Sequence, residues 1–326
     1  LVVEPEMAKQ VEDPSTLSES TAQPDDASDK TEAQVETTNP ISRDKIPAEV
    51  PVPTSAGRDA RTIQVETPLY TVTLNETGAV LDRLILKNYR ETVASDGPLK
   101  SMIQDTARNI NLQTGFAGNS VPGMEEAVYE LGTREDVVVV EGQKQTIDFQ
   151  WVNSDGVSVK KQFVFLPDSY LIELNISISN HSSAPIADNP FVKIAHVVGD
   201  PESRITFEGP MGLLNETLEE IKVKDIVDKP EIEGTFRWIG ITDRYFMNVL
   251  IPEESISGTM KMEKVGEDMI ISQLILPQTE IAPGDAKVFP FKAFIGPKDT
   301  ETLARANYEL GKAVNFGMFD ICLLYT

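Results

Sequence analysis

The segment Leu171-Ile-Glu-Leu-Asn-Ile-Ser-Ile178 alternates apolar and polar residues from Ile172 onward. Successive side chains of an extended chain point to opposite faces of a sheet. The segment therefore predicts a β-strand with one buried face and one solvated face, as is typical of antiparallel sheets.

Similar alternation recurs on both sides of this segment, throughout residues 61–298. A hairpin is indicated at Asn153-Ser-Asp-Gly156, because Asp-Gly readily supplies the positive φ of a tight turn. Helical periodicity is limited to short pieces near 213–221. Many short strands without βαβ alternation favour an all-β fold, a large antiparallel two-sheet sandwich, over a parallel sheet or two stacked small domains. Strands are expected at 70–74, 80–86, 146–152, 157–166, 171–178, 191–198, 235–241, 245–251, 269–276 and 286–295.

Residues 1–60 have a different composition. They contain 13 acidic residues, 5 basic residues and seven prolines, and the first aromatic residue of the chain is Tyr70. Such a segment buries too little apolar area to offset the entropy of ordering its backbone. We expect a disordered acidic linker rich in Pro, Ser and Thr that acts as a spacer. A recognition tail is the alternative.

The sequence changes again at 299–326. A helix is expected over 300–314, with Asp299 or Thr300 as its N-cap, because Leu303, Ala306, Leu310 and Val314 form one apolar stripe. That stripe should dock on the sandwich. The apolar run that follows suits a membrane interface, and folding back into the core is the alternative. The candidate interaction residues are Leu303, Leu310, Val314, Phe316 and Phe319.

Composition excludes several classes of function. The formal charge of −23 argues against nucleic-acid binding, and an anionic membrane surface would also repel the chain. Cys322 is the only cysteine, so neither an intrachain disulfide nor a cysteine-based zinc site can form. No run of 18 apolar residues occurs. Since the chain begins at Leu1, we expect a fragment or processed form whose membrane segments, if any, lie outside it.

Catalytic patterns are sparse. The two histidines, His181 and His196, form no HxH or HExxH spacing, and His196 lies in an apolar strand where a core position is favoured over a metal ligand. There is no nucleophile elbow, P-loop or dinucleotide fingerprint. Four aromatic residues could form a sugar platform, although core positions are favoured: Trp151, Trp238, Phe163 and Phe165. We therefore assign no catalytic, cofactor-binding or metal-binding residue.

Four separated motifs, in order, carry a family resemblance. Residues 236–252, FRWIGITDRYFMNVLIP, resemble a signature of the large periplasmic domain of YidC-type membrane insertases (the YidC/Oxa/Alb family). Residues 70–89, 161–170 and 291–319 resemble its opening strands, middle hairpin and exit toward the membrane.

The resemblance implies a β-supersandwich similar to galactose mutarotase, at 61–298, closed by the C-terminal helix. It also implies a non-enzymatic periplasmic module, without cofactor, of an inner-membrane insertase that assists insertion and folding of membrane proteins. Its implied partners are nascent membrane proteins, the Sec translocon and, at the C-terminal end, the inner membrane. A mutarotase-like carbohydrate-binding or carbohydrate-active domain is the alternative.

Overall fold

The computed structural model describes residues 58–199 and 206–314, which lie within one compact unit of the chain, Glu49–Thr326. The predicted linker 1–60 therefore falls outside the described residues, apart from its last three. Of these, Arg58 donates to the Glu76 carboxylate at 2.6 Å and to the Tyr129 carbonyl at 2.7 Å. The apolar run with Phe316 and Phe319 also lies outside the described residues.

The smaller of the two main sheets has five strands in the order β4-β3-β2-β1-β7. Its pairs are antiparallel except β1 with β7, which is parallel. Their bounds are β1 (Thr62–Glu66), β2 (Tyr70–Asn75), β3 (Val80–Arg90), β4 (Leu99–Ser101) and β7 (Val137–Val139).

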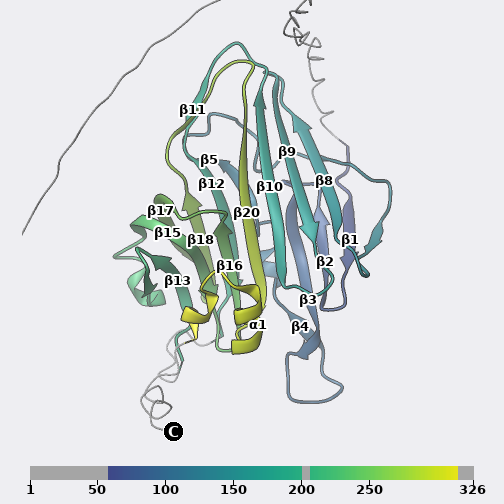
Figure 1. Ribbon diagram of the computed structural model, residues 1–326, viewed down its shortest axis with the longest axis vertical. Coiled ribbons are helices and arrows are strands. Elements are labelled where there is room, and N and C mark those ends of the chain that lie inside the picture. The colour runs from purple at the N-terminus through teal and green to yellow at the C-terminus, as the bar shows by residue number, and fades with distance from the viewer. Residues whose placement is uncertain (1–57, 200–205, 315–326) are drawn as a thin grey trace, which may run out of the picture. The chain divides into compact units, whose positions relative to one another are not determined.

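The larger sheet runs in the order β5-β12-β18-β17-β15-β16-β20-β10-β9-β8-β6, and β13 joins it by pairing with both β14 and β15 (Figure 1). All its pairings are antiparallel. Its strands are β5 (Gln113–Phe116), β6 (Glu130–Leu131), β8 (Gln145–Val152), β9 (Val157–Phe165), β10 (Leu171–Asn180), β12 (Pro190–Val197), β13 (Gly209–Leu214), β14 (Thr217–Glu220), β15 (Glu231–Thr242), β16 (Phe246–Pro252), β17 (Ile256–Val265), β18 (Met269–Ile275) and β20 (Ala286–Pro297).

The remaining elements are short. β11 (Ile186–Asp188) pairs with β19 (Thr279–Ile281). The helical elements are η1 (Asp105–Ala107), η2 (Val223–Asp225), α1 (Thr300–Ala306) and η3 (Leu310–Ala313).

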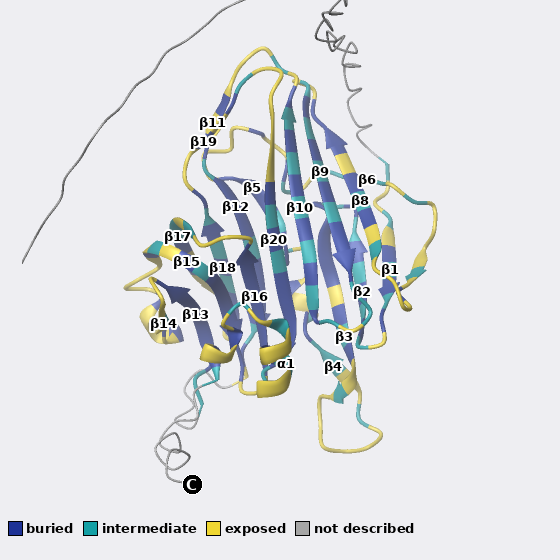
Figure 2. Ribbon diagram, in the orientation of Figure 1, coloured by how far each residue is buried: buried dark blue, intermediate teal, exposed yellow. Residues whose placement is uncertain are grey.

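A continuous apolar core lies between the two main sheets, and Figure 2 shows the buried stripes along the strands. The ring centroid of Tyr70 in β2 lies 6.3 Å from that of Tyr170, the residue immediately before β10. Lys161 of β9 is fully buried and donates to the Gly78 carbonyl at 2.7 Å. The all-β sandwich with a C-terminal helix, predicted from strand alternation, is therefore confirmed.

Several local predictions are confirmed as well. The 153–156 hairpin joins β8 to β9, with Gly156 at φ 88°. The aromatic residues for which the core was favoured over a sugar platform are all buried: Trp151, Trp238, Phe163 and Phe165.

The predicted continuous helix over 300–314 is wrong. Asp299 is the N-cap and accepts from the Thr302 N–H at 2.9 Å, but α1 ends at Ala306. Asn307, Tyr308 and Glu309 have φ values of 69°, 56° and 58°, which a right-handed helix does not allow. A short 3₁₀ turn, η3, follows them. The apolar stripe is thus carried by two short elements.

The helical pieces expected near 213–221 are also wrong. This segment is the β13–β14 hairpin, whose turn residues Asn215 and Glu216 have φ values of 48° and 68°. Cross-strand pairing with β15 overrides the weak local helical pattern there.

Candidate functional site

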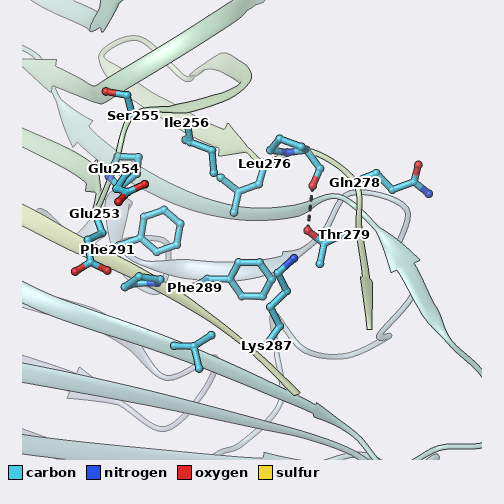
Figure 3. A pocket seen from close by; sticks show the side chains of 14 residues that line it. Glu253, Glu254, Ser255, Ile256, Leu276, Gln278, Thr279, Lys287, Phe289 and Phe291 are labelled. Carbon is cyan, nitrogen blue, oxygen red and sulfur yellow. Dashed lines mark hydrogen bonds between the residues drawn. The ribbon is translucent and has the colours of Figure 1, made fainter. Parts of the chain in front are cut away.

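A groove of about 510 Å³ opens beside β20, beyond the end of β16 (Figure 3). Three segments line it: residues 252–256 after β16, residues 276–279 after β18, and residues 287–291 of β20. Leu276, Phe289 and Phe291 are buried there and form apolar walls. A cavity of this size and lining has the character of a ligand site.

The register of β20 explains why the groove exists. β20 pairs with β10 from Ala286 to Phe294, but its ladder with β16 covers only Phe291 to Pro297. Next to the end of that ladder, the Glu253 N–H makes one long hydrogen bond, 3.4 Å, to the Pro290 carbonyl. Residues of an antiparallel strand turn their N–H and C=O groups alternately to the two sides. Val288, two residues before Pro290, therefore turns both groups toward the groove. The groove continues the line of β16, and its wall includes the edge of a strand.

Charged side chains are placed at the margins of the groove. Glu253 and Glu254 stand on the β16 side, and Lys287 stands on β20 (Figure 3). These three are the only ionisable side chains among the described residues that line the groove, and none is a histidine. The groove offers apolar contact, a backbone edge and charge, but not the histidine–carboxylate pair typical of proton-transfer catalysis.

His196 lies elsewhere and is sealed in the core. It is fully buried, and its Nε2 lies 3.2 Å from the Asp243 Oδ2. Burial alone would raise the pKa of Asp243, but His196 and the N–H groups of Tyr245 and Phe246 together hold that pKa below its usual range. The hydrogen bonds from the Tyr245 and Phe246 N–H groups to the Asp243 Oδ1 measure 2.8 and 2.7 Å. The pair therefore braces the turn between β15 and β16, in agreement with the core position favoured for His196.

Lys298 ties the same turn to the end of β20. Its Nζ donates to the Thr242 hydroxyl at 3.0 Å and to the Asp243 carbonyl at 2.9 Å. Burial lowers the pKa of Lys298, and nearby carboxylates, chiefly Asp243, oppose that decrease. This end of β20 is thus fixed by polar contacts between segments far apart in the sequence.

The C-terminal segment, residues 299–314, docks at this end. Leu303 and Leu310 are fully buried in the main core, as predicted, and Val314 is partly buried against it. Phe316 and Phe319 lie outside the described residues. The structure thus brings three of the five candidate interaction residues to one surface of the sandwich.

A cationic clamp holds the turn between α1 and η3. Two cations lie close to the Tyr308 ring: the Arg237 guanidinium is 5.0 Å from its centroid and the Lys292 amine is 5.2 Å from it. Three consecutive non-glycine residues at positive φ are costly. The clamp stabilises this otherwise unfavourable turn.

Sequence reasoning missed the groove, the Asp243 brace and the clamp. The mid-strand Pro290 between two phenylalanines was an available signal, because proline inside a strand marks an unpaired edge or a ladder end. The His196–Asp243 contact joins residues 47 positions apart, and the clamp brings Arg237 and Lys292 from two different strands to Tyr308. Local pattern gives no sign of either feature.

Two further features are absent from the described residues. Within 58–199 and 206–314, no group of three or more His, Cys, Asp or Glu side chains could hold a metal ion. In the same ranges, no helix has both the length and the apolar character needed to cross a membrane.

Comparison with known families establishes the relationship. The sequence model of the YidC periplasmic domain family matches residues 62–322. The chain belongs to this family. The chain is 28% identical over 279 residues to the membrane protein insertase YidC of Geobacter metallireducens, covering 84% of the chain and 52% of that protein. It is 27% identical over 258 residues to the Geobacter sulfurreducens insertase YidC, covering 78% and 48%. The chain thus spans about half the length of these curated relatives.

The fold of the chain also resembles a solved structure. A galactose mutarotase-like protein from Lactobacillus casei superposes with a TM-score of 0.50 at 12% identity, covering 72% of this chain and 99% of that structure. At this identity the likeness concerns the fold alone. It agrees with the mutarotase-like sandwich that the sequence resemblance implied.

Proposed function

We propose that this domain is a non-catalytic periplasmic module of a membrane protein insertase. In this role it assists the insertion and folding of inner-membrane proteins, alone or beside the Sec translocon. Family membership and the names of the curated relatives support the proposal. The partners of the module are nascent membrane proteins, Sec components and the inner membrane at its C-terminal end.

The docked C-terminal segment is the observation that carries this proposal. Leu303 and Leu310 anchor it in the core, and the Tyr308 clamp fixes its turn. Val314, the last described residue, is therefore held at this end of the sandwich. We assign to this segment the task of orienting the sandwich above the membrane, with Val314, Phe316 and Phe319 at the membrane-proximal end.

The test compares changes to the C-terminal segment with a control substitution, both made in the full-length insertase that carries this domain. Deletion of 300–320, or Leu303→Asp with Leu310→Asp, should reduce insertion of a reporter membrane protein into reconstituted vesicles. Val139→Asp, at an exposed position of strand β7 and outside the groove, is the matched control and should leave insertion near its starting level. Intact insertion after the deletion, combined with loss of insertion when strands within 70–250 are removed, would contradict the proposal.

The absence of catalysis is part of the same proposal. The one histidine–carboxylate pair in the described residues is the buried His196–Asp243 pair, and the groove has no histidine. We expect the purified domain not to accelerate the interconversion of sugar anomers, measured by polarimetry with galactose and glucose. Acceleration that disappears in His196→Ala would overturn this expectation.

A second function is favoured by the open edge of β20. The Val288 N–H and C=O can pair with an extended polypeptide laid along the groove, while Phe289 and Phe291 contact its side chains. Titration of ¹⁵N-labelled domain with extended apolar peptides and with oligosaccharides tests this function. Peptide binding should protect the Val288 amide from hydrogen exchange. Binding of sugars alone would instead favour the carbohydrate alternative.

A further inference from the structure

Two loops beside α1 expose apolar or aromatic side chains to solvent. Val93 lies in the loop between β3 and β4, and its side chain is as exposed as in an isolated peptide (110%). Tyr245 lies in the turn between β15 and β16 and is 61% exposed. The Asp243 carboxylate fixes the backbone of that turn through the N–H groups of Tyr245 and Phe246. The turn therefore presents the Tyr245 ring on a rigid support.

Contacts place the two loops at the same end as α1. The Tyr89 ring, near the end of β3, meets the Phe246 ring edge-on at 5.4 Å, and the Lys100 amine of β4 lies 5.2 Å from the same ring. The Lys298 N–H, two residues before α1, donates to the Tyr245 carbonyl at 2.7 Å. Figures 1 and 2 show the β3–β4 loop and α1 together at the lower end, with most of this loop exposed.

Single exposed apolar residues need no explanation on a soluble surface. Here, however, an aromatic residue is combined with a cation, because the Arg244 guanidinium lies 5.0 Å from the centre of the Tyr245 ring. Tyrosine with a neighbouring arginine suits the boundary between phosphate headgroups and acyl chains, where the ring lies in the apolar layer and the charge remains at the headgroups.

The sequence after this end points to the same partner. Beyond Val314 the chain carries six large apolar side chains with one charge among them: Phe316, Met318, Phe319, Ile321, Leu323 and Leu324, and Asp320. Such a run binds a lipid interface more readily than water. The two loops therefore share an end of the sandwich with the residue that leads into the most apolar run of the chain.

We propose that this end of the sandwich rests directly on a phospholipid bilayer, with Val93 and Tyr245 in the headgroup layer and Arg244 beside the phosphates. The inference relies on the proposed function only in taking the C-terminal end as the membrane side. It adds a second contact, made by the folded sandwich itself and separate from the C-terminal run.

Net charge gives this contact a recognisable salt dependence. A chain with a formal charge of −23 is repelled by anionic lipid, so apolar insertion has to drive the binding. Salt screens the repulsion, since the Debye length falls from about 30 Å at 0.01 M to about 8 Å at 0.15 M. Binding to vesicles that contain phosphatidylglycerol should therefore strengthen over this range, whereas a contact driven by charge attraction would weaken.

Site-specific fluorescence tests the depth of the contact. In the full chain with Cys322→Ser, an environment-sensitive dye is attached through Val93→Cys or, as the control, Val288→Cys. Val288 is also an exposed valine (54%). It lies nine residues before Pro297, the end of β20, which corresponds to about 30 Å along an extended strand. With phosphatidylethanolamine–phosphatidylglycerol vesicles, the dye at 93 should shift to the blue and be quenched by spin-labelled lipid. The dye at 288 should do neither, and equal behaviour at the two sites would overturn the proposal.

Paired variants separate this contact from that of the C-terminal run. Val93→Glu with Tyr245→Ser should weaken vesicle partitioning by about tenfold, because apolar contact is lost and a charge is introduced. Val288→Glu should leave partitioning unchanged, and both proteins should keep the parent's melting temperature. If the double variant partitions to vesicles as well as the parent does, binding is due to the sequence after Val314. That result would overturn this inference and leave the proposed function intact. A starting protein that does not bind vesicles would overturn it too.

Discussion

The two halves of β20 have opposite character, although they belong to one continuous strand. In the half that ends at Pro297, residues 291–294 are paired on both sides and residues 295–297 continue the ladder with β16. Lys298 and Asp243 brace its end. The half that begins at Ala286 is paired with β10 alone and forms a wall of the groove. The cause is a difference in length, since β16 has 7 residues and β20 has 12. A single sheet can thus provide a closed end that holds a neighbouring segment and an open end that can accept a chain.

The largest effect is expected where the C-terminal segment enters the core. Leu303→Ala and Leu310→Ala should each cost about 2–5 kcal/mol of docking free energy, because each removes a fully buried side chain and leaves a cavity. Hydrogen exchange of the Asn307 amide, which donates to the Leu303 carbonyl at 3.0 Å, reports the docking. Arg305→Ala, on the exposed face of α1, is the control. Equal exchange in all three variants would show that the segment is not held by its apolar contacts.

The polar brace should have the next largest effect. Asp243→Ala should lower the free energy of unfolding by about 1–3 kcal/mol, since it leaves buried His196 and two backbone N–H groups without their acceptor. Urea unfolding measures the change. Glu253→Ala, at the open half of β20, should change it little, and equal losses in the two variants would remove the contrast between the halves.

Acid should weaken the closed end before the open one. The pKa of Asp243 is lower in the folded protein than in the unfolded chain, so its contribution is complete above the unfolded value of about 4. The contribution is lost as pH falls through the lower folded pKa. Stability measured from pH 6 to pH 2.5 should decline less steeply in Asp243→Asn than in the parent, and identical slopes would contradict the assignment.

The clamp on Tyr308 should have a smaller effect. Tyr308→Ala removes two cation–ring contacts, each worth about 0.5–1 kcal/mol, and should speed exchange in η3. Tyr308→Phe keeps the ring but loses the hydrogen bond to Lys292, which raises the pKa of that amine. It should therefore fall between the parent and the alanine variant. An alanine variant with unchanged exchange would show that η3 is held without the clamp.

The open half should tolerate substitution best. Val288→Thr should change the free energy of unfolding by no more than about 0.5 kcal/mol, because the side chain is exposed and both residues suit a strand. A loss above about 1 kcal/mol in thermal unfolding would mean that the edge of β20 already has a structural partner.

Alternation predicted ten strands of the sandwich, including β10, but it missed others such as β1 and the central strand β17. The pattern in Leu171–Asn180 and the hairpin at 153–156 fix which side chains face inward, because a strand has only two faces. The same reasoning failed at 300–314. The apolar spacing is helical throughout, but three positive φ values interrupt the helix, and the clamp that stabilises them comes from β15 and β20.

The sequence by itself determined the all-β class, the core position of His196 within an apolar strand, and the docking of Leu303 and Leu310. Each follows from local apolar periodicity, because burying apolar side chains is favourable. Only the tertiary structure decided where β16 stops beside β20, which carboxylate braces the β15–β16 turn, and which loops meet beside α1. Those features join segments far apart in the chain. Their positions follow from sheet order and register, and no local pattern encodes either.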